Sequence, residues 1–573
     1  MGALASHPGA GECVLVISPR TLSRLSHMSL QDAGQATLHT WANTHTPAGV
    51  PAASSGLTRC RLPPMTDAAP LLYEVYTRQW LSGLSARLGR EIDLWAVPES
   101  ELDRLESASV THLWLMGLWP TGGKAKAEAV RHPELRRAYD DALPGWTDED
   151  ICGSPYAVSA YAVPPSIGGD EGLAALRKRL AERGIKLILD FVPNHTGLDH
   201  AWAVQRPHLY VGTPVGSDVK IKEAITIRGV HGERVLAHGK DPFFPGWTDT
   251  LQLDYRRPET RKAMIEQLEK VAARCDGVRC DMAMLMLNDV FAKTWAHVPA
   301  MDQNGQPIEP SADEFWWTAI ATVKNKHPDF MFLAEAYWDL EDRLCDLGFN
   351  FAYDKKLVDL LVHKDWGVTG HLHALGDKNN RRAHFLENHD EPRAAAHLAF
   401  ESHTAAALLI VGLPGLRFLH DGQLEGRRRF ARIQLARRAD EPVDRGVADI
   451  YDRVLSAVKG TAVGRGQWQL LQTREAWEQN GSHFAFTLVQ WQTPGDASRF
   501  DVVVINHADH RAQCRATITA QGLRQGTWTL RDVLSHEVYE RDGDDLADDG
   551  LFLDVGPHAA QLFRFERSDP GKR

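Results

Sequence analysis

The chain has 573 residues, too many for one compact hydrophobic core, so we expect one large domain and at least one smaller domain. Apolar residues make up 43% and charged residues 24%, as in ordinary globular proteins, and no long apolar run predicts a membrane span. A net charge of −11 provides no basic surface for nucleic acid, so neutral small molecules are the more favourable partners.

Two features of the sequence indicate the cellular compartment of the protein: its cysteines and the first part of the chain. Seven scattered cysteines, an odd number, indicate free thiols in a reducing compartment rather than a disulfide framework. We therefore expect a cytoplasmic protein. Residues 1–68 show no helical or strand period and lack the features of a secretory signal, so we expect a disordered extension. Met65, just before the first strand, is an alternative start.

From about Leu71, apolar strands alternate with amphipathic helical segments, the order typical of parallel βα units. Eight candidate strands predict a (β/α)8 TIM barrel over residues 69–460. The candidate strands are residues 71–76, 111–117, 186–192, 277–281, 330–336, 349–354, 384–390 and 415–420.

Two further regions adjoin the predicted barrel. About sixty residues separate the third strand from a helix that begins near Pro258, which predicts a small inserted subdomain at about 197–250. After about Gly460 the helical pattern stops. Short apolar segments separated by Gly, Asp and Asn then predict a C-terminal antiparallel β-sandwich over residues 461–573.

Polar residues close four of the candidate strands. In a TIM barrel the chemistry lies at the C-terminal ends of the strands, so these residues are the informative ones. They leave three carboxylates without an evident structural use, Asp281, Glu335 and Asp390. The four segments are DFVPNH (190–195), GVRCDMAM (277–284), FLAEAYW (332–338) and FLENHD (385–390).

The fourth strand predicts an ionised carboxylate. The two-residue period of a strand places Arg279 and Asp281 on one face, with Val278 and Cys280 on the other. A neighbouring cation lowers the pKa of a carboxyl group, as a nucleophile at neutral pH requires. We therefore expect Arg279 to hold Asp281 ionised, and Cys280 to be a core residue without reactivity.

The fifth strand predicts a protonated carboxyl group. Glu335 follows a strongly apolar segment and lies between two alanines, where burial and nearby carboxylates should raise its pKa. Two carboxyl groups with pKa values pushed apart are what double-displacement hydrolysis of a glycoside needs. Such a retaining mechanism predicts a separation of about 5 to 5.5 Å between Asp281 and Glu335.

The four segments, in this order and on these strands, resemble the four conserved regions of glycoside hydrolase family 13, the α-amylase family. The resemblance covers roughly residue 70 to the end. It implies that Asp281 is the nucleophile, Glu335 the general acid/base and Asp390 the transition-state stabiliser. It also implies roles around the sugar: Arg279 orients the nucleophile, His195 and His389 hydrogen-bond the sugar, Tyr156 stacks on it, and Asp190 and Asn194 support the site.

The chain departs from the family pattern at positions that contact sugar. Ala157 follows Tyr156 where the family has an aspartate, and Met284-Leu285 replace a common Lys-His pair on the acceptor side. We therefore expect altered acceptor subsites and a preference for short α-glucosides. Glu391 and Arg393 follow Asp390 closely enough to supply a compensating group, or else they form an ion pair that fixes the loop.

No cofactor or metal is expected. In the segment Leu251–Asp254, the aspartate that often binds calcium in the family is replaced by Gln252, a poorer ligand for a hard cation. A metal-dependent TIM-barrel enzyme of another family, with His195 and His389 as ligands, is a weak alternative.

The function that the resemblance implies is hydrolysis of α-glucosidic bonds in oligosaccharides, with a small carbohydrate as substrate. The alternative within the fold is transglycosylation or isomerisation of trehalose-like or sucrose-like glucosides. A non-catalytic, glucan-binding relative is the alternative of another class, but such a protein would be expected to lose at least one of the three acids. The linkage, the chain length and the oligomeric state stay open.

Overall fold

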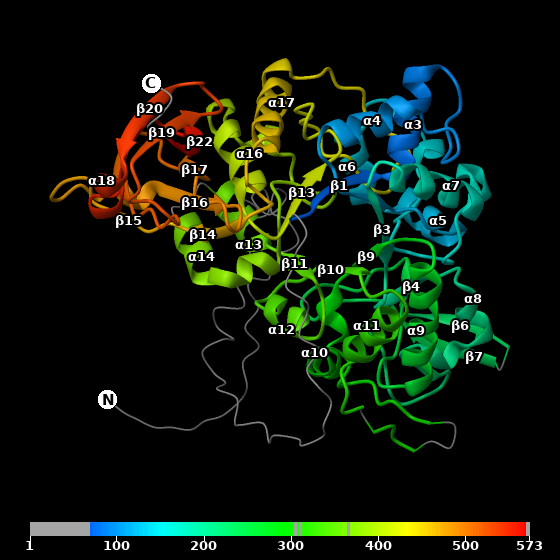
Figure 1. The fold of residues 1–573 in the computed structure, drawn as a ribbon. Helices are drawn as coiled ribbons and strands as arrows, with labels where there is room; N and C mark the ends of the chain where they lie inside the picture. Colours follow the sequence, from blue (N-terminus) through cyan, green and yellow to red (C-terminus); the bar gives the residue numbers. More distant parts are fainter. Residues whose placement is uncertain (1–68, 231, 303–305, 310, 364–366, 569–573) are drawn as a thin grey trace, which may run out of the picture. The chain divides into compact units, whose positions relative to one another are not determined.

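Eight parallel strands close into a barrel, which confirms the predicted (β/α)8 architecture (Figure 1). The structure, a computed structural model, describes residues 69–230, 232–302, 306–309, 311–363 and 367–568, so the predicted extension 1–68 lies outside the described residues. The barrel strands are β1 (Leu71–Tyr76), β2 (His112–Met116), β3 (Lys186–Phe191), β9 (Gly277–Cys280), β10 (Met331–Ala334), β11 (Phe351–Tyr353), β12 (Arg382–His384) and β13 (Leu416–His420), and β13 pairs with β1 to close the ring.

The seventh strand differs from its prediction. The sequence places it at residues 384–390, whereas β12 ends at His384. Beyond it, the side-chain oxygen of Asn388 accepts hydrogen bonds from the main-chain N–H groups of Asp390 and Glu391, each at 2.9 Å. This side-chain turn replaces sheet pairing, so Asp390 lies on a loop rather than at the end of a strand. Each of the other seven predicted segments contains the strand found.

Helices follow the strands, and α9 begins at Pro258, where proline at the first helical position is favoured. The longer helices are α3 (Thr77–Leu88), α4 (Glu99–Ser107), α5 (Gly123–Arg131), α6 (Pro133–Ala142), α7 (Gly169–Ala181), α9 (Pro258–Ala272), α11 (Phe315–Lys326), α13 (Lys355–Val362), α14 (Val368–Leu375), α16 (His403–Gly412) and α17 (Arg445–Lys459). Among the described residues, no helix is long and apolar enough to span a membrane.

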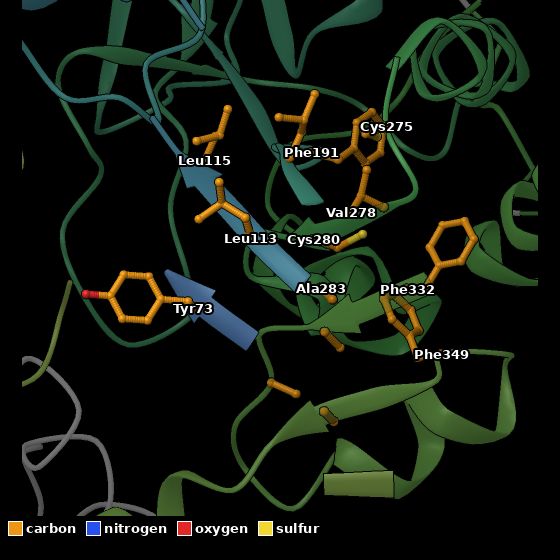
Figure 2. Close-up of a cluster of buried hydrophobic side chains, with 14 of the residues drawn as sticks. Tyr73, Leu113, Leu115, Phe191, Cys275, Val278, Cys280, Ala283, Phe332 and Phe349 are labelled. Carbon is orange, nitrogen blue, oxygen red and sulfur yellow. The ribbon is translucent and has the colours of Figure 1, made fainter. Parts of the chain in front are cut away.

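Strand β9 shows how the alternating period creates two environments. Val278 and Cys280 point into an apolar layer that also contains Phe191 and Phe332 (Figure 2). Arg279, between them, belongs to the opposite face of the strand. Burial raises the pKa of the Cys280 thiol well above its usual range, which agrees with an unreactive core residue. The five cysteines in the described part of the chain are free thiols.

The insertion after β3 is a small sheet tied to the barrel by a strand pair. Its three antiparallel strands are β5 (Gly212–Pro214), β7 (Gly232–Ala237) and β6 (Ala224–Gly229), in that spatial order. Strand β4 (His195–Gly197) pairs with β8 (Thr250–Gln252), and this pairing places His195 opposite Gln252. The insertion therefore starts and ends at the C-terminal side of β3.

The C-terminal region consists of two antiparallel sheets. One has the order β14 (Gln467–Leu470), β16 (Phe486–Gln492), β17 (Arg499–Asn506), β22 (Ala560–Arg567), β19 (Thr527–Asp532) and β20 (Val538–Asp542); the other has β15 (Thr473–Arg474), β18 (Ala512–Ala516) and β21 (Leu551–Val555). Phe500 of the first sheet and Leu553 of the second share one buried cluster, as in a β-sandwich. A short helix, α18 (Gly543–Asp548), interrupts the predicted all-strand pattern.

The barrel helix α16 packs against this sheet. The indole N–H of Trp491, on β16, donates a hydrogen bond of 2.9 Å to the main-chain oxygen of Gly412, at the end of α16. The missing side chain at Gly412 permits this approach, because a Cβ there would lie 3.0 Å from the methyl groups of Val503. Both groups of the hydrogen bond are buried, so the loss of either leaves the other unsatisfied.

We expect Trp491→Phe to lower the free energy of unfolding by about 1 to 3 kcal/mol, because the Gly412 carbonyl loses its buried donor. Urea-induced unfolding monitored by circular dichroism measures the change. The control is Trp477→Phe, since Trp477 is 53% exposed and its replacement should change stability by less than about 0.5 kcal/mol. Equal midpoints for both variants would contradict the proposed importance of this contact.

Candidate active site

A buried arginine lies at the centre of the carboxylates that the sequence singles out. The guanidinium of Arg279 places Nη1 2.8 Å from Oδ1 of Asp281 and Nη2 2.7 Å from Oε2 of Glu335. Its Nη1 also lies 3.9 Å from Oδ1 of Asp190. The sequence predicts the first of these pairs, whereas the contact with Glu335 arises because β9 and β10 are neighbours in the barrel. One cation therefore faces three carboxyl groups.

Glu335 is fixed from two further directions. Met282 has a left-handed backbone, with φ of 43°, and its N–H donates to Oε2 of Glu335 at 2.7 Å. The hydroxyl of Tyr337 donates to Oε1 at 2.8 Å. A left-handed conformation costs a residue with a side chain about 1 to 2 kcal/mol, and such outliers concentrate at functional sites. The carboxyl group of Glu335 is thus held in one position.

The pKa values of the two carboxyl groups agree only in part with the prediction. Burial raises the pKa of Glu335 to about 7, even though the charge of Arg279 opposes this effect. Burial also raises the pKa of Asp281 above its ordinary value, because it outweighs the charge and hydrogen bond of Arg279. Arg279 therefore lowers the pKa of Asp281 as predicted, but the net pKa lies above the ordinary value because burial has the larger effect.

A second charged group holds Asp390. His389 lies between Glu74, whose Oε1 is 2.5 Å from Nδ1, and Asp390, whose Oδ2 is 2.9 Å from Nε2. Burial favours the neutral imidazole, but the two carboxylates outweigh it and raise the pKa of His389 well above its usual value. In turn, burial raises the pKa of Asp390, but the charge of His389 outweighs this and holds that pKa below its ordinary value. The result is an imidazolium between two carboxylates.

Tyr156 connects the two charged groups. Its hydroxyl oxygen lies 2.5 Å from Nε2 of His389, and the centre of its ring lies 5.1 Å from Cζ of Arg279. The guanidinium also lies over the rings of Trp114 and Tyr353, at 5.3 and 5.8 Å. Cation–π contacts of this kind help to stabilise a charge removed from water. The aromatic side chains therefore contribute to the electrostatics of the site as well as to its walls.

His195, Asn194 and Asp190 border the same site. Burial lowers the pKa of His195 to about 4, so its ring is neutral, and the ring centre lies 5.1 Å from that of Trp247. Asp190 accepts a hydrogen bond of 2.7 Å from the N–H of Gly117, and burial raises its pKa to about 7. The Asn194 side chain lies beside His195, with Nδ2 3.3 Å from Nδ1. The structure thus brings all the sequence-predicted site residues together.

The position of Gln252, where the resemblance implies a calcium-binding aspartate in the family, does not fit a cation. The amide N–H groups of Gln252 donate to Oδ1 and the main-chain oxygen of Asn194, each at 2.9 Å, and to the oxygen of Leu253 at 3.1 Å. A calcium ion needs these oxygens as ligands, but here a hydrogen-bond donor takes them. In the described part of the chain, no group of three or more His, Cys, Asp or Glu side chains has a metal-binding arrangement.

The two residues considered as replacements for the missing carboxylate at Ala157 have other partners. Arg393 is buried and hydrogen-bonds Glu387 and Nδ1 of His420. Glu391 is also buried, and its Oε1 lies 3.5 Å from Nζ of Lys355. Both residues therefore have the contacts of loop anchors. Arg393 pairs with Glu387 and Glu391 pairs with Lys355, rather than Glu391 with Arg393.

Three residues of the site are absent from the sequence prediction. Tyr337 and Tyr353 contact Glu335 and Arg279 through their hydroxyl groups. Glu74 lies on β1, 315 residues from His389 along the chain. One signal was available for Glu74, because it is the single charged residue in the strand LLYEVY, all of whose residues are buried. A buried charge without a local partner predicts a distant one.

Comparisons with known proteins point to the family that the motifs resemble. Residues 148–208 match the family model described as the α-amylase catalytic domain. Over 376 residues the chain is 24% identical to α-amylase 3 of Dictyoglomus thermophilum, covering 62% of this chain and 63% of that protein. The chain is thus similar to proteins of the α-amylase superfamily, glycoside hydrolase family 13. It spans less than two thirds of the length of that relative.

Other proteins that the chain resembles differ in the reaction they are named for. The α-1,4-glucan:maltose-1-phosphate maltosyltransferase of Pseudomonas aeruginosa is 24% identical over 208 residues, covering 35% of this chain and 25% of that protein. Among solved structures, a maltogenic α-amylase of Thermotoga neapolitana superposes with a TM-score of 0.60 at 17% identity, over 87% of this chain and 99% of that one. An α-amylase of Geobacillus thermoleovorans in complex with acarbose gives 0.58 at 18% identity, over 88% and 99%. These structures share the fold.

The charged state of His389 predicts a pH-dependent contribution to stability. Its folded pKa lies above that of the unfolded chain, so the contribution is fully present below about pH 6.5 and is lost as the pH rises through the folded value. We expect His389→Gln to lower the free energy of unfolding by about 3 to 5 kcal/mol at pH 6, because Glu74 loses its buried partner. The deficit should shrink at higher pH.

Denaturant unfolding at several pH values measures this difference. The matched control is His510→Gln, because His510 also pairs with an aspartate, Asp509 at 3.0 Å, but at an exposed position. That variant should unfold like the wild type at every pH. A deficit for His389→Gln that is constant between pH 6 and pH 9 would contradict a charged imidazole.

Proposed function

We propose that the chain is a retaining α-glycosidase that hydrolyses α-glucosidic bonds of oligosaccharides by double displacement. One observation carries the proposal: a single buried guanidinium contacts Asp281 at 2.8 Å and Glu335 at 2.7 Å, and the pKa of Glu335 lies near 7. Because one guanidinium contacts both carboxyl groups, it favours the short distance between them that a retaining enzyme needs, about 5 to 5.5 Å. The names of the relatives, α-amylases among them, support an α-glucan as substrate.

In the first step, protonated Glu335 donates its proton to the glycosidic oxygen, and the leaving sugar departs as an alcohol. The carboxylate of Asp281 attacks the anomeric carbon from the opposite face and forms a covalent glycosyl ester. Arg279 stabilises the ionised form of Asp281, and a bound sugar that displaces water from the site increases the effect of this cation. The attack leaves Glu335 as a carboxylate.

In the second step, Glu335 accepts a proton from a water molecule that attacks the anomeric carbon. The ester bond to Asp281 breaks, and the product keeps the α-configuration. A pKa near 7 suits both halves of this cycle, because the group must exist in both protonation states at neutral pH.

The remaining residues support the charge and position of the sugar. Asp390, held ionised by His389, stabilises the positive charge that develops on the sugar ring. Tyr156 offers its ring as a stacking face, and neutral His195 and charged His389 hydrogen-bond the hydroxyl groups of the sugar. Asp190 and Asn194 position Arg279 and His195. No cofactor takes part in these steps.

A transglycosylase or isomerase is the second candidate. It uses the same glycosyl ester, but a sugar hydroxyl replaces water in the second step. The observation that favours it is the apolar turn after the nucleophile, where Met284 and Leu285 are buried in the apolar cluster outside the barrel. A non-catalytic glucan-binding protein is disfavoured because Asp281, Glu335 and Asp390 are all present.

We further propose that the protein acts on small carbohydrates in the cytoplasm. The free thiols of its described cysteines favour a reducing compartment. A neutral sugar, rather than nucleic acid, suits the net charge of −11.

The function is tested by incubating the protein with maltose, isomaltose, trehalose, sucrose and malto-oligosaccharides. We expect shorter products, and proton NMR at early times should detect the α-anomer first because the mechanism retains configuration. Products longer than the substrate favour the transferase, and isomeric disaccharides favour the isomerase. Initial formation of the β-anomer would rule out double displacement.

The assigned roles predict different effects for the two carboxyl groups. Asp281→Asn should lower kcat/KM by about 10⁴-fold or more on every substrate, because no nucleophile remains. Glu335→Gln should lose about 10² to 10⁴-fold on maltose, but far less on an aryl α-glucoside whose leaving group needs no proton. Wild-type kcat/KM should fall as the pH rises through about 7, and Glu335→Gln should lack this decrease. Equal losses on the aryl glucoside would contradict these roles.

A further inference from the structure

A cavity of about 260 Å³ lies at the N-terminal ends of several barrel strands. Its wall includes Leu71, the first residue of β1, and Arg417, which pairs with Leu71 near the start of β13. The segments before β2 and β3 and the end of α17 also line it. Asp281 and Glu335 each follow the C-terminal end of a strand, so the cavity is separate from the proposed active site.

Arg417 is a buried cation in the wall of this cavity. The residue is only 7% exposed, and its Nη2 donates a hydrogen bond to the main-chain oxygen of Ala69. Its Nε is buried and has no hydrogen-bond partner among the described residues. Burial and the charge of Arg465 lower the pKa of Arg417 to about 10, and no carboxylate in the described part of the chain opposes them.

Other buried arginines of the barrel are compensated. Arg279 contacts Asp281 and Glu335, and Arg393 contacts Glu387. A buried charge is costly unless an anion balances it, and one hydrogen bond to a neutral carbonyl group does not do so. The position of Arg417, with an unsatisfied Nε beside a cavity, therefore favours an anion from solution.

Two further cations line the cavity without a carboxylate partner in the described chain. Nη1 of Arg465 donates to the main-chain oxygen of Lys459 at 2.9 Å, and Nζ of Lys459 donates to that of Ser107. Both acceptors are neutral. The acidic residue of the lining, Glu106, lies 3.8 Å from Nε of Arg183, so a fourth cation balances its charge. The wall therefore carries a net positive charge.

The rest of the wall is largely apolar. Buried side chains that line the cavity are Leu71, Val110, Val411, Leu455, Val458 and Val463. The volume lies slightly below the usual range for drug-sized ligands, about 300 to 1,000 Å³, so it suits a small molecule. A guanidinium offers planar donors that match two oxygens of a carboxylate or phosphate group. The lining as a whole thus suits an oxyanion that carries a short apolar body.

We propose that this cavity binds a small organic oxyanion, with its carboxylate or phosphate group on Arg417 and Arg465 and its apolar body against Val411, Leu455 and Val458. The bound anion balances the buried charge of Arg417. It therefore stabilises the folded chain, by an amount that increases with the logarithm of the anion concentration above the Kd. The site does not depend on the proposed glycosidase function, and its test needs no sugar.

The test measures the melting temperature and the Kd, by titration calorimetry, of the full chain with butyrate and with butyl phosphate in Tris buffer. Butylammonium at equal ionic strength is the control ligand, because it has the same apolar body and the opposite charge. We expect a saturable rise in melting temperature with at least one of the anions and no rise with butylammonium. The anion with the lower Kd identifies the preferred head group.

Three variants locate the binding. Arg417→Met should weaken the binding of the preferred anion at least 10-fold, and Arg465→Gln about 5- to 10-fold, because each removes a charge from the head group. The matched control is Arg474→Gln. Arg474, like Arg465, is an exposed arginine that donates to a main-chain oxygen, that of Asp549 at 2.6 Å, but it lies in the C-terminal region. This variant should bind the anion with the wild-type Kd.

The proposal is overturned if neither anion gives a saturable rise in the wild type, or if butylammonium gives the same rise. An equal Kd in Arg465→Gln and Arg474→Gln would also overturn it, since the anion would then bind elsewhere. If Arg417→Met does not fold, Arg465→Gln still decides, because its exposed side chain can be replaced without disturbing the core.

Discussion

The arrangement of the site depends on a positive charge buried inside the barrel. Arg279 has no exposed surface, and removing a guanidinium from water costs several kcal/mol unless anions and hydrogen bonds replace the water. Asp281 and Glu335 provide close contacts, Asp190 a longer one, and three aromatic rings surround the group. The same contacts that keep the arginine stable in the core also fix the two carboxyl groups relative to each other. Stability and chemistry therefore share one set of interactions.

His389, the second buried cation, is also stabilised by neighbouring carboxylates, but here the charges of the partners depend on each other. Its charge exists only because Glu74 and Asp390 are present, and Asp390 remains ionised only because His389 is charged. Glu74 is on β1, whereas His389 and Asp390 follow β12, and β13 lies between these strands in the barrel. Closing the barrel thus assembles the pair. The site therefore combines carboxyl groups whose pKa burial raises to about 7, Glu335 and Asp190, with one that His389 holds ionised, Asp390.

The insertion provides contacts that the barrel strands do not. In the proposed mechanism, the motif residues surround the bond to be cleaved and provide its charged groups. The segment from Gly239 to Trp247 lies against His195 and carries Phe243 to the indole of Trp338. Because this segment belongs to the insertion, its sequence can vary without changing the carboxylates.

The sequence by itself determined the barrel, the insertion after β3, and the pairing of Arg279 with Asp281, because strand alternation is a local property with a period of two residues. It also indicated which residues lie at strand ends. Only the tertiary structure decided that Arg279 also contacts Glu335, that Glu74 is the partner of His389, and that Asp390 lies on a loop beyond a short β12. It also decided the direction of the Asp281 pKa shift, since burial outweighs the neighbouring cation. These contacts form between segments that are far apart in the sequence, and the pKa of Asp281 depends on how deeply the folded barrel buries it. A local sequence pattern encodes neither the contacts nor the burial.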